Sequence, residues 1–210
     1  MVEMNKINIG FLASCRGTNM QAIIDACKNG SLPAEPAVVI SNNGSSGALD
    51  RAKSETIPAY HLSNKNYPDA EQLDQVISDT LQEHAVDLVL LAGYMKMLGP
   101  ITLRLFKGRI INIHPSLLPK HGGRGMYGKH VHAAVLAAGD TETGVTVHLV
   151  DGKYDTGTIL AQHKISVKKE DSAESLAERV LSVEHEFYVE TLDKILSGEI
   201  KIKGIAVTQT

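Results

Sequence analysis

The sequence has few cysteines, no surplus of positive charge and no long apolar run. Its two cysteines, Cys15 and Cys27, are too few for a disulfide framework, and neither lies at a paired metal-ligand spacing. The formal net charge is −3, from 21 Lys and Arg against 24 Asp and Glu, which disfavours nucleic-acid or membrane-surface binding. No apolar stretch approaches the ~20 residues that span a bilayer, and the N-terminus lacks the apolar core of a signal peptide. These absences predict a cytoplasmic protein with no membrane and no nucleic-acid partner.

Short apolar runs alternate with segments of helical periodicity over most of the chain. Runs this short and unbroken are typical of strands that are buried on both faces. The expected strands cover residues 7–12, 37–40, 58–60, 87–91 and 109–113, and the expected helices cover 20–27, 48–55, 69–84 and 100–106. This alternation predicts a parallel sheet covered by crossover helices.

The pattern changes after residue 140. Residues 145–150 and 158–167 predict strands with no clear helix between them, so the sheet is expected to end in antiparallel strands. Leu176 and Phe187 belong to a last long amphipathic helix. Because no repeat, low-complexity segment or linker divides the chain, we predict one α/β domain over 1–210. Its sheet is expected to be Rossmann-like, open, mostly parallel and flanked by helices, with antiparallel strands toward the C-terminus.

The loop after the first expected strand has the residues of a phosphate site. Gly17 allows close approach of the backbone to an anion, and Thr18 and Asn19 add side-chain donors at a helix N-terminus. The loop is neither a dinucleotide-binding GxGxxG nor a P-loop. The alternative is that Thr18 and Asn19 only cap the helix.

Asn112 and His114 lie two residues apart at the end of an expected strand, so their side chains leave the same face. That face opens toward the crevice where open α/β sheets bind ligands. A carboxamide donor beside an imidazole suits acyl transfer, because one stabilises an oxyanion and the other handles a proton.

A carboxylate that orients His114 is expected in the segment 151–157, where Asp151 and Asp155 both qualify. The sequence does not choose between them. The alternative is that His114 is a hydrogen-bonded core histidine and that the aspartates are turn residues.

Three further histidines lie in or after a glycine-rich stretch, at His121, His130 and His132. No carboxylate or cysteine accompanies them at a known metal-binding spacing, so no metal site is predicted. His130 and His132 are expected on different faces of a helix. Residues 121–129 are interpreted as a mobile loop at the rim of the site.

Several segments together resemble the phosphoribosylglycinamide formyltransferase family, folate-dependent enzymes of de novo purine biosynthesis, over roughly residues 6–200. The similarity rests on four segments, namely 14–23, 91–98, 112–119 and 154–157. The segment 112–119, Asn-Ile-His-Pro-Ser-Leu-Leu-Pro, is specific to folate formyltransferases as a group. The loop Gly17–Asn19 is typical of members that act on the glycinamide nucleotide.

The resemblance implies roles for individual residues. The catalytic residues would be Asn112, His114 and Asp155, which chooses between the two aspartates. The substrate phosphate would bind Gly17, Thr18 and Asn19. The ribose and glycinamide would contact Gly93, Met95, Pro115 and Glu184, and without the resemblance Glu184 would be interpreted as an exposed helix charge. The pterin of 10-formyltetrahydrofolate, the co-substrate, would contact Tyr94, Met95, Lys96, Met97, Leu98, Val150 and Asp151.

The resemblance also places a phosphate-binding half at about 1–100 and a folate-binding, catalytic half at about 101–210. Lys96 and Arg109 would be the nearby cations, and Asp155 is expected to raise the pKa of His114 by charge pairing. The chain departs from family members in its longer 121–129 loop and in Leu181, which replaces a Gln near the ribose in some members.

The predicted function is transfer of a formyl group from 10-formyltetrahydrofolate to the amine of glycinamide ribonucleotide, without a metal, by a monomer or homodimer. A formyltetrahydrofolate hydrolase would use the same three residues with water as acceptor, but that family normally has an additional N-terminal domain. A tRNA formyltransferase would need a basic C-terminal domain. A catalytically silent folate- or nucleotide-binding module is the alternative from another class.

Overall fold

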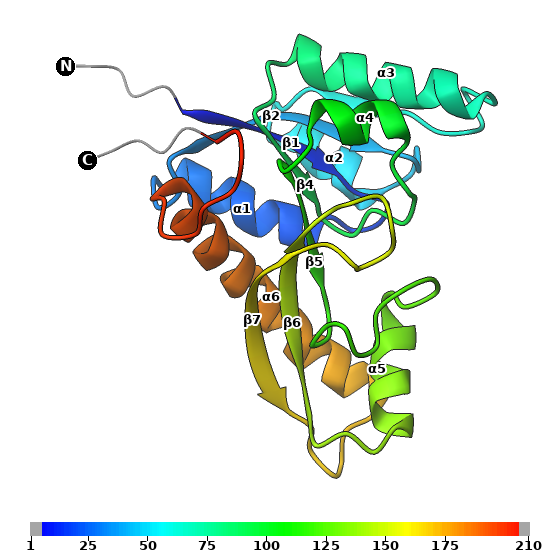
Figure 1. Cartoon of the computed structure of the whole chain (residues 1–210), viewed down its shortest axis with the longest axis vertical. Coiled ribbons are helices and arrows are strands. Elements are labelled where there is room, and N and C mark those ends of the chain that lie inside the picture. Colours follow the sequence, from blue (N-terminus) through cyan, green and yellow to red (C-terminus); the bar gives the residue numbers. More distant parts are fainter. Residues whose placement is uncertain (1–5, 206–210) are drawn as a thin grey trace.

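The protein is described by a computed structural model over residues 6–205. Seven strands form one sheet in the order β3-β2-β1-β4-β5-β6-β7 (Figure 1). The strands are β1 (Ile7–Leu12), β2 (Ala34–Ser41), β3 (Ala59–His61), β4 (Leu88–Leu91), β5 (Ile110–His114), β6 (Glu142–Leu149) and β7 (Ile159–Ser166). The helices are α1 (Thr18–Lys28), α2 (Gly47–Ser54), α3 (Ala70–Glu83), α4 (Pro100–Leu105), α5 (Lys129–Ala137) and α6 (Ala173–Leu196).

The first five strands run parallel, and β6 and β7 are antiparallel to their neighbours. The predicted open, mostly parallel sheet with antiparallel C-terminal strands is therefore confirmed. The order of strand addition changes sides at β1: β2 and β3 lie on one side of β1, and β4 to β7 lie on the other. Ligands bind at such a switch point, beyond the carboxyl ends of the strands.

Helices cover both faces of the sheet (Figure 1). One apolar cluster joins the sheet to α1, α2, α5 and α6, and it contains the fully buried Phe11 and Tyr188. A second cluster joins the other face to α3 and α4 and contains Leu81 and Phe106. Burial on both faces explains why the central strands have unbroken apolar runs in the sequence.

Helix α5 is the element that the sequence analysis did not define. It follows the glycine-rich stretch directly, begins after Gly128, which has a φ of +51°, and has no side-chain cap. The usual N-cap residues that mark the start of a helix are therefore missing from the sequence. The other elements match their expected positions within a few residues at each end.

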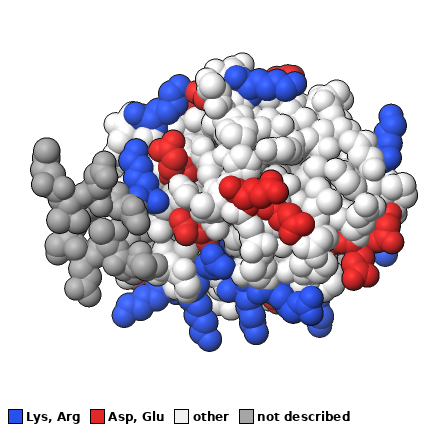
Figure 2. All heavy atoms as spheres, turned by 90° about the horizontal axis from the view of Figure 1, so that it is seen from above, with Lys and Arg blue, Asp and Glu red and all other residues white. Residues whose placement is uncertain are grey.

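The surface charge is mixed. On the face that Figure 2 presents, Lys and Arg side chains are dispersed around the edge, and Asp and Glu side chains lie among them and at the centre. That face therefore has no continuous basic patch of the kind that attracts a nucleic-acid backbone. Within residues 6–205, none of the helices is both long enough and apolar enough to cross a bilayer.

Candidate active site

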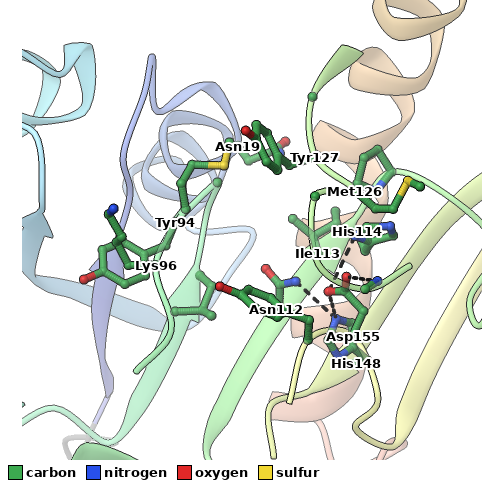
Figure 3. A pocket seen from close by; sticks show the side chains of 18 of the residues that line it. Asn19, Tyr94, Lys96, Asn112, Ile113, His114, Met126, Tyr127, His148 and Asp155 are labelled. Atoms are coloured by element: carbon green, nitrogen blue, oxygen red, sulfur yellow. Dashed lines mark hydrogen bonds and ion pairs between the residues drawn. The ribbon is translucent and has the colours of Figure 1, made fainter. Parts of the chain in front are cut away.

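A cavity of about 790 Å³ lies at the carboxyl ends of β1, β4 and β5. Its volume is in the range of small-molecule sites. The loops after these strands, residues 123–129, the β6–β7 connection and α6 all contribute to its lining. Figure 3 shows Asn112, His114, His148 and Asp155 grouped on one side of this cavity. The site is therefore at the position that the sheet topology predicts.

His114 and Asp155 lie close together. His114 ends β5 and is 3% exposed, and its Nδ1 lies 3.6 Å from Oδ1 of Asp155. Asp151 lies elsewhere: its carboxylate accepts hydrogen bonds from the Lys153 amide and the Thr156 hydroxyl. The structure thus brings one of the two candidate aspartates to the imidazole, and it is Asp155.

The other ring nitrogen of His114 has a backbone partner. Nε2 donates a hydrogen bond to the carbonyl oxygen of His121 at 2.9 Å, so Nε2 is protonated and Nδ1 is left to face Asp155. Burial lowers the pKa of His114, and the charge of Asp155 opposes this effect without overcoming it. The expected raising effect of Asp155 on this pKa is present, but the net shift is downward because desolvation of the imidazolium is the larger effect.

Asn112 and His148 face each other across the antiparallel pair β5 and β6. The Asn112 carboxamide donates to Nε2 of His148 at 3.1 Å, and Nδ1 of His148 donates to the Leu149 carbonyl at 2.8 Å. His148 therefore orients the carboxamide. The sequence analysis missed this residue, although His148 was already in an expected strand next to the segment with the candidate aspartates.

The carboxylate of Asp155 is held from several sides. Its Oδ1 lies 3.7 Å from Nε2 of His148, and its Oδ2 accepts the Gly123 amide at 2.9 Å. Burial acts to raise the pKa of Asp155, but His148, His114 and the Gly123 amide outweigh it, so this pKa lies below its ordinary value. Asp155 is consequently ionised at neutral pH.

The loop before α1 has a constrained backbone. Gly17 is the N-cap with a φ of +69°, and a Cβ there would lie 2.9 Å from the backbone of Ala48. No side chain caps α1, so the capping interpretation of Thr18 and Asn19 is wrong. Among the loop residues, Arg16 and Asn19 line the cavity, whereas Gly17 and Thr18 do not.

Asn19 connects this loop to the last helix. Its Nδ2 donates to Oε2 of Glu184 at 3.1 Å, and both residues line the cavity. Glu184 is 7% exposed, so its interpretation as an exposed helix charge is wrong. Burial raises its pKa to about 7, and the hydrogen bond from Asn19 only partly offsets this effect.

The segment after β4 forms another wall of the cavity. Met95 and Met97 are 37% and 52% exposed, and both line the cavity together with Tyr94, Lys96 and Leu98. The Met95 amide donates to Ser14 Oγ at 2.8 Å, which ties this segment to the first loop. Gly93, Pro115, Val150 and Leu181 also line the cavity, whereas Asp151 does not.

Arg109 is not near the cavity lining. It precedes β5, at the amino end of the sheet, and its guanidinium donates to the carbonyls of Asp87 and Leu105. The expectation that Arg109 is a cation of the site is therefore wrong. The cations that line the cavity are Arg16, Lys96, Arg124, Lys129 and Lys153.

Residues 123–129 lie along the cavity, and Tyr127 is 50% exposed there. On α5, His130 is exposed and His132 is buried, so the expected difference between these two histidines is confirmed. Over residues 6–205, no group of three or more His, Cys, Asp or Glu side chains is arranged to hold a metal ion.

An open α/β sheet with a carboxamide, an imidazole and a carboxylate around one cavity defines an enzyme suited to acyl-group transfer. Residues 7–192 match the formyl transferase family. The chain is 42% identical over 195 residues to phosphoribosylglycinamide formyltransferase of Haemophilus influenzae, covering 93% of this chain and 90% of that protein. The chain belongs to the formyl transferase family.

Solved structures give the same result. The phosphoribosylglycinamide formyltransferase of Bacillus halodurans has 40% identity and a TM-score of 0.85, over 91% of this chain and 96% of that one. The glycinamide ribonucleotide transformylase 1 of Symbiobacterium toebii has 38% identity and a TM-score of 0.88, over 95% of this chain and 92% of that one. The formyl donor of this family is 10-formyltetrahydrofolate, and the chain is a folate-dependent formyltransferase.

Proposed function

We propose that the chain transfers the formyl group of 10-formyltetrahydrofolate to the glycinamide amine of 5′-phosphoribosylglycinamide, in de novo purine biosynthesis. The observation that carries this proposal is the placement of Asn112, His114 and Asp155 along one cavity. The amine attacks the formyl carbon, a new C–N bond forms, and the bond from that carbon to N10 of the folate breaks.

Asn112 acts as the oxyanion donor in this mechanism. The formyl oxygen becomes negative when the amine adds, and a fixed N–H in a water-poor site stabilises that charge in the transition state. The hydrogen bond between Asn112 and His148 keeps the carboxamide in one orientation before substrate arrives. Preorganisation of this kind lowers the reorganisation cost of the reaction.

His114 moves the proton from the attacking amine to N10 of the folate. Because Nε2 already donates to the His121 carbonyl, the free lone pair is on Nδ1, and Nδ1 accepts the proton. The imidazolium then has the negative charge of Asp155 3.6 Å away. Asp155 thereby stabilises the protonated intermediate form of the ring, which afterwards releases the proton to the leaving nitrogen.

Most of the residues with binding roles line the cavity, although Gly17 and Thr18 do not. The substrate phosphate binds at Gly17, Thr18 and Asn19, where the N-terminus of α1 supplies free amides. The ribose and the glycinamide contact Gly93, Met95, Pro115 and Glu184. The pterin contacts Tyr94, Met95, Lys96, Met97, Leu98 and Val150, and Asp151 contributes through the backbone of its segment.

We assign the whole chain to one formyltransferase domain, with phosphate binding in residues 1–100 and folate binding and catalysis in 101–210. The partners are the two small molecules, and neither a nucleic acid nor a membrane takes part. The protein acts in the cytoplasm as a monomer or homodimer.

The test is formyl transfer from 10-formyltetrahydrofolate, followed by the absorbance of the deformylated folate, with and without glycinamide ribonucleotide. Folate turnover that requires the nucleotide supports the transferase. Turnover that is equal without the nucleotide would instead establish a hydrolase. No turnover under either condition would leave a binding module and overturn the proposal.

A further inference from the structure

A short backbone segment, Lys120–Gly123, contacts both His114 and Asp155. The His121 carbonyl accepts a hydrogen bond from Nε2 of His114, and the Gly123 amide donates to Oδ2 of Asp155, both at 2.9 Å. One turn of chain therefore sets the orientation of the imidazole and of the carboxylate that faces it. We refer to residues 120–123 as the bracket segment.

The conformation of the bracket segment needs external support. His121 has a φ of +54°, in the left-handed region of the backbone, which residues with a Cβ adopt only at a cost in free energy. Part of the support is local: Ser116, which precedes the segment, donates from Oγ to the Lys120 carbonyl at 2.8 Å and to the His121 carbonyl at 3.4 Å. Further support comes from Asp140, which is more distant in the sequence.

Asp140 lies in the connection between α5 and β6 and binds two side chains of the bracket segment. Its Oδ2 accepts from Nε2 of His121 at 2.7 Å, and its Oδ1 accepts from Nζ of Lys120. These two groups lower the pKa of Asp140, Lys120 most strongly, so the carboxylate is ionised at neutral pH. Asp140 lines a separate cavity of about 250 Å³ and is absent from the lining of the substrate cavity.

We propose that Asp140 is a positioning residue: through His121 it holds the backbone carbonyl that fixes the orientation and the Nε2–H tautomer of His114. A carbonyl oxygen only accepts hydrogen bonds, so it selects the tautomer whose Nδ1 is free to take a proton. Without the anchor, the carbonyl moves, and the ring exchanges between tautomers. The kinetic test of this inference rests on the proposed function, because it measures turnover. The tautomer of His114 can be measured without substrate and does not depend on that function.

The titratable groups around His114 come from several elements. They are His121 of the bracket segment, His132 of α5, His148 of β6 and Asp155 of the β6–β7 connection. Removal of Asp140 takes away the partner of the His121 imidazole and leaves His132, His148 and Asp155 with the contacts that they have. A change in the tautomer of His114 after such a substitution is therefore transmitted through His121, whose carbonyl contacts the ring.

The kinetic test compares three variants with wild type. Asp140→Ala is expected to lower kcat about 10-fold with the KM for the nucleotide within about twofold of wild type, because ring orientation and not binding is lost. Asp140→Asn keeps an acceptor oxygen for His121 and is expected to restore most of kcat. The matched control is Glu142→Ala, which removes the exposed Glu142–Lys164 pair beside the same small cavity and should leave kcat unchanged.

The spectroscopic test uses ¹⁵N-histidine NMR without substrate, with His114→Gln to assign the signal. Wild type is expected to show the Nε2–H tautomer, and Asp140→Ala a mixture of both tautomers. His121→Asn tests the same anchor if Asp140→Ala does not fold, since Asn tolerates the left-handed backbone and is too short to replace the long imidazole contact.

Each outcome decides the proposal. An unaltered Nε2–H tautomer in Asp140→Ala, or in His121→Asn where that variant is used, or an Nδ1–H tautomer in wild type, overturns it. A loss of kcat equal in Glu142→Ala and Asp140→Ala also overturns it, since the effect would then be general to that surface. If wild type shows no nucleotide-dependent turnover, the proposed function fails, while the NMR result still decides the role of Asp140.

Discussion

The imidazole of His114 and the carboxylate of Asp155 face each other across 3.6 Å, and both are also bound by the backbone of one loop, at His121 and Gly123. Neither side chain is free to take another orientation while these contacts persist. The pair is therefore preorganised for proton transfer, and a change of charge at either residue should alter the rate of the reaction.

Replacement of Asp155 by Asn tests this pair directly. We expect kcat to fall by about 10²–10³-fold, because the imidazolium loses the charge that stabilises it. The circular dichroism spectrum should be unchanged. Asp79→Asn is the control, since that exposed carboxylate on α3 accepts a hydrogen bond from Gln75 of the same helix and has no role in the site. Near-normal turnover of the Asp155 variant would exclude the assigned role.

Replacement of Asn112 by Ala tests the oxyanion donor. Loss of one such donor costs about 3 kcal/mol in the transition state, so kcat should fall roughly 100-fold with little change in either KM. Asn8→Ala is a matched control, because that carboxamide lies at the amino end of β1 and bonds to the Ala85 carbonyl. Equal effects of the two substitutions would show that Asn112 is only structural.

The pH dependence of kcat/KM follows from the pKa of His114 in the free enzyme. Burial lowers this pKa below the usual 6.5, so Nδ1 stays free to accept a proton at pH values where an exposed histidine is already protonated. The value of kcat/KM should therefore fall toward acid with a midpoint below 6.5. In Asp155→Asn, the remaining activity should have a still lower midpoint, since the raising effect of the charge is gone. Activity that increases toward acid would indicate that the imidazolium is the active form.

The raised pKa of Glu184 predicts that the free energy of unfolding depends on pH. Its pKa is raised from 4.5 to about 7 in the folded protein, so the folded state holds this proton more tightly than the unfolded state does. The resulting stability is present below pH 4.5 and is lost as the pH rises through 7, a change of about 3 kcal/mol. Glu184→Gln should accordingly gain stability relative to wild type at pH 8 but not at pH 4, as measured by urea unfolding.

The control for this measurement is Glu178→Gln, an exposed glutamate on the same helix that also lines the cavity. Its free energy of unfolding relative to wild type should not vary with pH in this way. A Glu184 variant that behaved like the Glu178 variant would contradict the buried, protonated carboxyl.

Gly17→Ala tests the geometry of the loop before α1. The substitution combines a left-handed backbone with a Cβ that would lie 2.9 Å from the backbone of Ala48, so the loop must shift. We expect the KM for the nucleotide to rise at least 10-fold, because the amides at the start of α1 move. Gly30→Ala has the same backbone strain, with no atom within 4 Å of the added Cβ, and should leave KM unchanged.

The sequence predicts the sheet well because the strands are buried on both faces, which leaves unbroken apolar runs such as 87–91 in the pattern. The start of α5 escapes prediction because a glycine with positive φ replaces the usual capping residue. His148 escapes for a different reason: its role depends on the β5–β6 register, which pairs it with Asn112. The cross-strand partner of a residue is not encoded in local periodicity.

The pKa shifts of the site are harder to predict from the sequence than the residues that form it. The motif around His114 indicated the imidazole, but the direction of its pKa shift depends on how completely the ring is desolvated. Similarly, Glu184 has the local sequence of an exposed helical charge, and only the packing of α6 against α1 buries it. Burial results from contacts between distant segments, so sequence patterns predict such residues poorly.

The hydrogen bond from Asn19 to Glu184 joins residues 165 positions apart. During synthesis on the ribosome, β1 to β5 emerge long before α6, so the substrate cavity lacks this wall until the last helix has left the exit tunnel. A nascent chain that stalls before α6 would consequently expose the apolar surface of α1 that α6 covers, and it would depend on chaperones until translation resumed.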